Sequence, residues 1–239
     1  MRDVRARMMG SAWSYLRVIG MPLFHLLTLA AFYSAMGRSA LLGTDKMVFY
    51  ASGILPFMLF LYPVRSNILA IDDNRPLLVF PRVNPIDLVI SRALLEIVNS
   101  LIVITVLALA LFAFGADIVP KNPIKTLSGI GMTMLFSLAF CLPNAIISRL
   151  VTNWLQACVL TAVGLYISSG ALFLPSQMPP IVSEIIYFNP LAHCVEWVRS
   201  GYYETYHEGL LDKRYLIGVI LALLVIGFSL ERFLRGKLN

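Results

Sequence analysis

Six stretches of the chain carry no charged residue and are apolar enough to form membrane-spanning helices. Most are close to the about 20 residues that one helix needs to cross a bilayer, and amphipathic flanks extend the last. Of the 239 residues, 59% are hydrophobic and 13% are charged, whereas soluble domains carry about 25% charged residues. We therefore expect an all-α integral membrane protein, with residues 1–239 forming one transmembrane domain of six spans. The stretches cover residues 18–37, 47–64, 97–116, 126–148, 150–183 and 215–230.

The fifth stretch is too long to be a single span. As one helix, residues 150–183 would be about 51 Å long, whereas the hydrocarbon core is about 30 Å thick. We expect span five to end near Leu174 and the chain then to return partway into the membrane. Irregular backbone at that depth is tolerated only where protein or a cavity lines it, so residues 175–212 are a candidate gate segment. The stretch is interrupted by Gly164, Gly170, Pro175, Pro179 and Pro180.

A second helix start lies within this gate segment. Asn189 can cap a helix and Pro190 suits its first position, so we expect a helix over residues 191–203. Glu196 and Arg199 are three residues apart and can pair. One side of the helix would carry Leu191, Val195, Val198 and Tyr202, and the other His193, Glu196, Arg199, Ser200 and Tyr203. This pattern predicts a helix at the membrane interface, in an aromatic belt formed by Trp197, Tyr202, Tyr203 and Tyr206.

The most charged internal segment is an elbow between the second and third stretches, residues 71–96. Prolines divide it into short pieces, because proline removes a backbone donor and clashes with the preceding turn. The last piece restarts a helix, since Asn84 can cap it, Pro85 suits the first position and Asp87 favours the positive helix start. Such a polar elbow is either a place where something outside the membrane acts on the spans or a plain solvated loop. Its charged residues are Asp72, Asp73, Arg75, Arg82, Asp87, Arg92 and Glu96.

The distribution of basic residues predicts the orientation in the membrane. With six spans, 12 of the 19 lysines and arginines fall on the side of the two termini and the elbow, and seven fall on the other side. The positive-inside rule therefore places the termini and the elbow in the cytoplasm and the gate segment outside. Residues 1–17 combine arginines with apolar residues, which predicts an amphipathic helix on the membrane surface. A signal peptide is the competing interpretation, but the following apolar run is too long and no cleavage site is evident.

The sequence lacks the motifs of an enzyme or an ATPase. It contains no phosphate-cradling GxxxxGK(S/T), no GxSxG, no HExxH and no paired-cysteine pattern, so we expect no catalytic residue, metal or cofactor. His25 is either a hydrogen-bonded interior residue or a proton relay, and Asn144 beside Pro143 either satisfies a kinked helix or has a function. The spans otherwise lack the ionisable relays of ion-coupled carriers. If the chain transports, its energy source lies on another polypeptide that docks from the cytoplasm.

Four segments in this order resemble the permease subunit of ATP-binding-cassette exporters of capsular polysaccharide, and more widely the O-antigen and teichoic-acid exporter permeases. They are MRDVRAR, VNPIDLVISRALLE, SSGALFLPSQMP and NPLAHCVEWVRSGYY. The resemblance implies a homodimer in the bacterial inner membrane with two separate ATPase subunits beneath it. It also implies a polysaccharide that passes between the subunits toward periplasmic or outer-membrane export partners, and no nucleic-acid partner.

The same resemblance assigns roles to parts of the chain. The elbow would hold the coupling helix that fits a groove on the ATPase, residues 1–17 would be the interface helix, and the gate segment would form short periplasmic helices. The coupling residues would be Asp72, Asp73, Asn74, Arg75, Pro85 and Asp87. The gate residues would be Pro175, Pro179, Asn189, Pro190, His193, Glu196 and Arg199.

Aromatic residues in the second half of the chain are candidates for contact with a glycan. Aromatic faces stack on sugars, although interfacial anchoring or packing between spans explains each of them equally well. The candidates are Trp154, Tyr166, Phe173, Trp197, Tyr202 and Tyr203. The leading hypothesis is thus a polysaccharide export permease, beside a permease of the same architecture for a drug or lipid. From other classes, a membrane transferase acting on lipid-linked sugars and a scaffold remain open, although Asp72 and Asp73 lack the partners of a metal site.

Overall fold

The computed structural model describes residues 20, 24, 27–28, 42–43, 46–203, 206 and 209–238. All regular structure in these residues is helical, which confirms the predicted all-α class. The predicted interface helix over residues 1–17 lies outside the described residues, and so does most of the predicted first span, His25 included.

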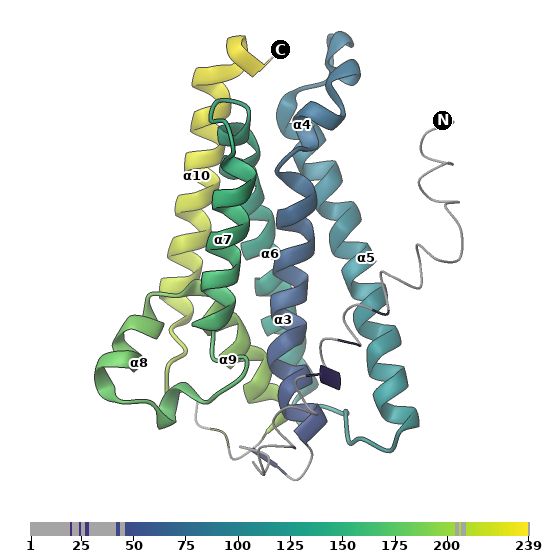
Figure 1. Cartoon of the computed structure of the whole chain (residues 1–239), viewed down its shortest axis with the longest axis vertical. Coiled ribbons are helices and arrows are strands. Elements are labelled where there is room, and N and C mark those ends of the chain that lie inside the picture. Colours follow the sequence, from purple (N-terminus) through teal and green to yellow (C-terminus); the bar gives the residue numbers. More distant parts are fainter. Residues whose placement is uncertain are drawn as a thin grey trace.

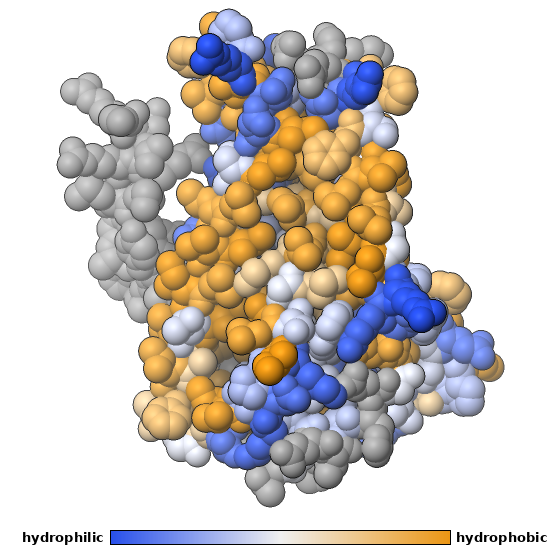
Figure 2. Space-filling model, turned by 180° about the vertical axis from the view of Figure 1, so that it is seen from behind, coloured by the Kyte–Doolittle hydropathy of each residue, from blue (hydrophilic) through white to orange (hydrophobic). Residues whose placement is uncertain are grey.

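Five helices run side by side along the length of the molecule (Figure 1). They are α3 (Lys46–Asn67), α5 (Pro85–Ala113), α6 (Pro123–Ser148), α7 (Trp154–Ile167) and α10 (Lys213–Leu238). Four of them contain a stretch long and apolar enough to cross a membrane: Met47–Asn67, Pro85–Ala113, Pro123–Ser148 and Lys213–Leu234. Figure 2 shows a broad apolar band around the middle of the bundle and hydrophilic residues toward its two ends, as a multi-pass membrane protein requires.

The central helix of the bundle is α3. Its apolar window is 83% buried, compared with 22% for α10, because α5, α6 and α9 (Pro190–Tyr202) all pack against it. Stacked rings of Phe60 and Phe136, 5.0 Å apart, join α3 to α6. The outer helices expose large apolar side chains such as Leu109, Leu160 and Val225. These side chains form the apolar band, which is suited to contact with lipid.

The connections between the long helices divide between the two ends of the bundle. The short helices α4 (Ala70–Asp73) and η1 (Arg75–Val79) lie at the end that also holds the α6–α7 turn and the end of α10 (Figure 1). The α5–α6 loop, η2 (Pro175–Gln177) and α8 (Pro180–Tyr187) lie toward the opposite end (Figure 1). The elbow, the α6–α7 turn and the end of α10 thus share one end, as the predicted order of spans requires.

The predicted end of span five is wrong by about two helical turns. Helix α7 stops at Ile167, not near Leu174, and its 14 residues make a helix of about 21 Å. Gly170 then adopts φ 74°, a left-handed conformation that residues other than glycine rarely adopt. The chain from Ser168 to Leu174 therefore forms a turn inside the bundle before η2 begins.

The predicted restart of a helix at the elbow is confirmed. The backbone N–H of Asn84 donates to the Asp87 carboxylate at 2.9 Å, and Pro85 occupies the first turn of α5. Helix α5 then continues without a break for 29 residues, so the second half of the elbow and the third predicted span are one helix. At about 44 Å it extends beyond the hydrocarbon core.

Asn144, beside Pro143 in α6, is hydrogen-bonded within the protein, in agreement with the structural interpretation of that residue. Its side-chain Nδ2 donates to the Phe140 carbonyl at 2.8 Å, and its Oδ1 accepts from Trp154 Nε1 at 3.1 Å. The second of these bonds joins α6 to the start of α7. Helix α6 passes through Pro143 and continues to Ser148.

Candidate functional site

Helix α9 starts as its sequence predicts. Asn189 Oδ1 accepts from the Leu191 N–H at 2.9 Å, and Pro190 follows in the first turn. The Asn189 amide also donates to the Leu165 carbonyl at 2.7 Å and to Ser168 Oγ at 2.9 Å. The cap of α9 is therefore bound to the end of α7, and this fixes where the gate segment re-enters the bundle.

The rest of α9 contradicts the prediction of an interfacial helix. Its apolar side is buried, but so is its polar side, where His193, Glu196 and Arg199 are 0%, 1% and 0% exposed. Helix α9 packs against both α3 and α6, so its polar side is enclosed in the bundle. The amphipathic pattern is real, but its polar side meets protein groups instead of water or lipid headgroups.

Two glycines let α9 approach α6 at backbone distance. A Cβ on Gly129 would lie 2.8 Å from the Val198 nitrogen, and one on Gly201 would lie 2.1 Å from Thr126 Oγ1. The Asn122 N–H donates to the Gly201 carbonyl at 2.8 Å. Small residues at helix contacts inside membranes allow such close packing. They explain how a 13-residue helix fits between two spans.

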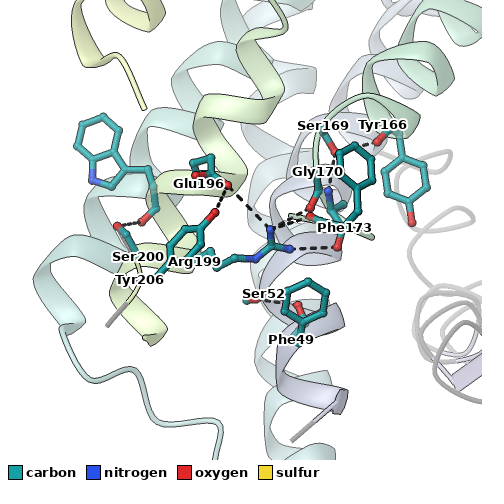
Figure 3. A network of polar contacts seen from close by, with 12 residues as sticks. Phe49, Ser52, Tyr166, Ser169, Gly170, Phe173, Glu196, Arg199, Ser200 and Tyr206 are labelled. Atoms are coloured by element: carbon teal, nitrogen blue, oxygen red, sulfur yellow. Dashed lines mark hydrogen bonds and ion pairs between the residues drawn. The ribbon is translucent and has the colours of Figure 1, made fainter. Parts of the chain in front are cut away.

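The Arg199 guanidinium connects α9 to the turn after α7 and to α3 (Figure 3). Nη1 donates to the Gly170 carbonyl at 2.9 Å and the Phe173 carbonyl at 3.3 Å, and Nη2 donates to the Ala171 carbonyl at 3.1 Å. The guanidinium carbon lies 4.4 Å from the centre of the Phe49 ring in α3. The planar fork of arginine suits this task, because it presents several donors in fixed directions.

The predicted pair of Glu196 and Arg199 is present, at the outer limit of an ion pair. Glu196 Oε1 lies 4.0 Å from Arg199 Nη1, and it also accepts from the Tyr206 hydroxyl at 2.5 Å (Figure 3). Tyr206 is 9% exposed, so its side chain is buried beside the pair. Buried charges must be paired and hydrogen-bonded to be tolerated, and here the two terminal nitrogens of Arg199 and Oε1 of Glu196 have partners, whereas the buried Arg199 Nε has none among the described residues.

A second polar cluster centres on His193. Its Nε2 lies 2.8 Å from the Tyr187 carbonyl, and the Asp212 N–H donates to Nδ1 at 3.0 Å. Because Nδ1 accepts, the network assigns the proton to Nε2 and makes the ring neutral. The Tyr187 hydroxyl donates to Asp212 Oδ2 at 2.8 Å, and the Tyr215 ring lies 5.0 Å from the His193 ring. This cluster holds α8 and the start of α10 to α9.

The His193 cluster predicts a pH dependence of stability. Burial lowers the pKa of His193 below its ordinary value of 6.5, and hydrogen bonds lower the pKa of Asp212 below 3.8. For His193, the unfolded chain binds the proton more readily, so the free energy of unfolding falls as the pH falls below about 6.5, by at most about 1.4 kcal/mol per unit of pKa difference. Asp212 contributes only at still lower pH.

We expect the thermal unfolding temperature of the protein in detergent to decrease between about pH 7 and about pH 5. His193→Gln keeps a donor for the Tyr187 carbonyl but removes the titration, so its unfolding temperature should vary less over this range. An equal pH dependence in both proteins would contradict the assignment to His193.

The predicted gate residues thus fall into two groups. Asn189, His193, Glu196 and Arg199 lie in the buried polar contacts of α9. The prolines shape the backbone around them, since Pro175 begins η2, Pro179 precedes α8 and Pro190 begins α9. The Ser183 hydroxyl donates to the Pro175 carbonyl at 2.8 Å and joins η2 to α8.

The six aromatic candidates do not form one surface in the protomer. Trp154 lies at the start of α7, bonded to Asn144, whereas Tyr166 lies near its other end. The Tyr166 ring is buried and stacks on Phe57, with ring centres 3.9 Å apart. Trp197 is partly buried, with Lys213 Nζ 4.7 Å from its ring centre. Phe173, Tyr202 and Tyr203 are also partly buried. Contact with a glycan stays a prediction for all six.

The structure also divides the six candidate coupling residues of the elbow. Asp73 and Arg75 are exposed, whereas Asp72 forms an ion pair with Arg149 in the α6–α7 turn. Asn74 Nδ2 donates to the Ala70 carbonyl at 2.8 Å and closes α4. Pro85 is buried and Asp87 serves the cap of α5, so these two build the elbow. Asp73 and Arg75 are exposed without a role in these local contacts, and coupling to an ATPase stays a prediction for all six residues.

The elbow also has an apolar tip beside these charges, which the six candidate coupling residues do not include. Leu77, Val79 and Phe80 are 44%, 81% and 61% exposed at the end of the bundle, beyond the apolar band. A shallow cavity of about 350 Å³ next to them is lined by Arg75, Pro76, Leu78 and Val79. The sequence carries a signal for this tip, the apolar run PLLVF inside a charged elbow. Exposed apolar groups together with charges are typical of a protein-binding surface.

Metal-site geometry is not found among the residues that the structure describes, since no group of three or more histidine, cysteine or acidic side chains is close enough together. Cys141, Cys158 and Cys194 are free and buried. Burial raises the pKa of the Cys194 thiol in α9 to about 12, so it is protonated at neutral pH.

Comparison with known families decides the class of this bundle. The sequence profile described as ABC-2 type transporter matches residues 2–203. The chain belongs to the ABC-2 type transporter family. Two sequences of the polysialic acid transport protein KpsM from Escherichia coli are 25% and 26% identical to it over 232 residues. The match covers 97% of this chain and 90% of each relative.

Membership in the ABC-2 type transporter family confirms the resemblance drawn from the four sequence segments. It makes the chain the membrane subunit of an ATP-binding-cassette transporter, a multi-pass protein that works with an ATPase partner. As an ABC-2 type permease it is a transport subunit.

Proposed function

We propose that this chain is the permease subunit of an ATP-driven exporter that moves capsular polysaccharide, with or without a lipid anchor, across the bacterial inner membrane. The observation that carries the proposal is the similarity to the polysialic acid transport proteins, which runs through 97% of the chain. O-antigen or teichoic acid as the substrate, or a drug or lipid, is the alternative within the same architecture. Neither the buried polar cluster of α9 nor the elbow holds the acid or histidine constellation that a glycan transferase needs.

In this proposal two copies of the chain form the pathway, and two ATPase subunits dock beneath them in the cytoplasm. The distribution of basic residues supports a cytoplasmic elbow and cytoplasmic termini. The α8 and α9 end then faces outward, where periplasmic and outer-membrane partners receive the polymer. The turn over residues 168–174, held by Arg199, and helices η2, α8 and α9 act as the outer gate.

The proposal is tested by deleting the gene in its native strain and supplying it again on a plasmid. Cell-surface polysaccharide is measured with a glycan-specific stain, and intracellular polysaccharide is measured after cell lysis. We expect the deletion to remove surface polysaccharide, to accumulate it inside, and to be reversed by the plasmid. Normal surface polysaccharide in the deletion strain would overturn the assignment. Loss of a surface lipid instead would favour the alternative substrate.

The apolar tip of the elbow supports a prediction about ATPase docking. Val79→Asp or Phe80→Ser should weaken binding of the ATPase by about 2 kcal/mol, or roughly 30-fold, because buried apolar anchors dominate the energy of protein interfaces. Binding is measured by titrating labelled ATPase onto the permease in nanodiscs. Val119→Ser is the matched control, since Val119 is 60% exposed but lies in the α5–α6 loop at the opposite end. Equal affinity of the tip variants and this control would exclude docking at the tip.

A further inference from the structure

The elbow is bound directly to the turn between α6 and α7 by a side-chain ion pair. Asp72 in α4 accepts from Arg149 Nη1, although the two residues are 77 positions apart. The Arg149 side chain is 13% exposed and that of Asp72 42% exposed, so the pair lies at the edge of the bundle. Arg149 is also the residue that ends α6, where a cation is favourable for the helix dipole.

A second contact next to this pair also joins the start of the elbow to the end of α6. The Ser148 hydroxyl donates to the Ile68 carbonyl at 2.5 Å, where α3 has ended and α4 is about to begin. Ile68 and Ile71 are each 1% exposed and belong to the core that includes Ile146 of α6. The start of the elbow is therefore packed on the end of α6 and cannot shift without disturbing it.

Helix α6 carries this connection to the other end of the molecule. It runs from Pro123 to Ser148. Near its start, Gly129 of α6 lies against the backbone of Val198 in α9, and Gly201 of α9 lies against Thr126 of α6. The Asn122 N–H also donates to the Gly201 carbonyl at 2.8 Å. A rigid helix with a fixed contact at each end can transmit a displacement, because packed interfaces move between discrete arrangements instead of deforming continuously.

We propose that Arg149 is a positioning residue that transmits movement of the elbow to α6, and through α6 to the gate helix α9. Asp72 is then an internal partner of Arg149 and not a contact with the ATPase. This inference rests on the proposed function, because it assumes that the ATPase acts on the elbow. The pair is only partly buried, so its removal should cost less stability than the removal of a fully buried pair. Thermal unfolding of each variant in detergent checks that it remains folded.

The test is a charge exchange between the two residues. Asp72→Arg and Arg149→Asp are made singly and together, and each permease is reconstituted with its ATPase in proteoliposomes. We expect each single variant to bind the ATPase as the unaltered protein does but to lose about tenfold in polysaccharide exported per ATP hydrolysed. The double variant should recover to within about threefold. Asp73→Arg combined with Arg149→Asp should not recover, because the ion pair of Arg149 is formed with Asp72.

A second readout does not depend on the substrate. Ser176 in η2 is exposed and the three native cysteines are buried, so Ser176→Cys gives a single reactive thiol at the outer end. We expect ATP to change the rate at which an impermeant maleimide labels this thiol in the complex. Both single variants should lose that change, and the charge exchange should restore it.

The outcomes separate the two proposals. Nucleotide-dependent labelling without polysaccharide export overturns the proposed substrate but leaves the role of Arg149 supported. Single variants that keep the labelling change, single variants that lose ATPase binding, or a double variant without recovery would each overturn the role of Arg149.

Discussion

Replacing Arg199 with methionine is expected to lower the free energy of unfolding by about 3–5 kcal/mol, because it leaves a buried carboxylate without its cation. The variant also removes three hydrogen bonds to the carbonyls of Gly170, Ala171 and Phe173. The turn after α7 then loses its hydrogen bonds to Arg199, so export should fall together with stability. Thermal unfolding in detergent and surface polysaccharide in cells provide the two measurements.

Two further variants separate the parts of this effect. Arg199→Lys keeps the charge but lacks the planar fork that reaches three carbonyls, so it should recover only part of the stability. Adding Glu196→Gln to Arg199→Met removes the uncompensated charge, and the double variant should be less destabilised than the sum of the single ones. Arg214→Met, at an exposed position at the start of α10, is the control. If Arg199→Met unfolds at the same temperature as this control, the buried network does not hold the gate.

Gly53→Ala is expected to destabilise the protein by about 1–3 kcal/mol, the usual effect of overpacking a close contact. An added Cβ would lie 2.4 Å from the Ala171 carbonyl oxygen, 2.7 Å from its Cα and 2.8 Å from Arg199 Nη2. Because two of these atoms are backbone, the turn after α7 has to move away from α3. Export should decrease even where the protein still inserts, since the displaced atoms are those that Arg199 binds.

Two other glycines supply matched controls for this variant. A Cβ at Gly131 in α6 or Gly164 in α7 would meet nothing within 4 Å. Alanine at either position should be neutral or stabilising by up to about 1 kcal/mol, because alanine favours a helix more than glycine does. The ranking by thermal unfolding should therefore place Gly53→Ala below both controls. Three variants of equal stability would show that α3 does not closely contact the turn.

Local patterns predicted much of the elbow correctly. Asn84, Pro85 and Asp87 form the helix start that their order indicates, because caps depend on a few consecutive residues and the backbone between them. The same holds for Asn189 at the start of α9 and for Asn144 beside Pro143. The partner of Asp72 could not be found in this way. Arg149 is close to Asp72 only because α4 folds onto the end of α6.

By itself, the sequence determined that this protein is a helical membrane protein, which of its loops share an end, and where several helices begin. These properties follow from hydrophobic length, charge and capping, which act over one helix or one turn. Only the tertiary structure decided that α9 is buried and that Arg199 and Glu196 face protein. An amphipathic pattern states that two sides differ and not what covers each side. Gly53 in α3 allows the turn after α7 to approach to backbone contact, and Gly129 in α6 allows α9 to do the same. These close contacts enclose the polar side of α9.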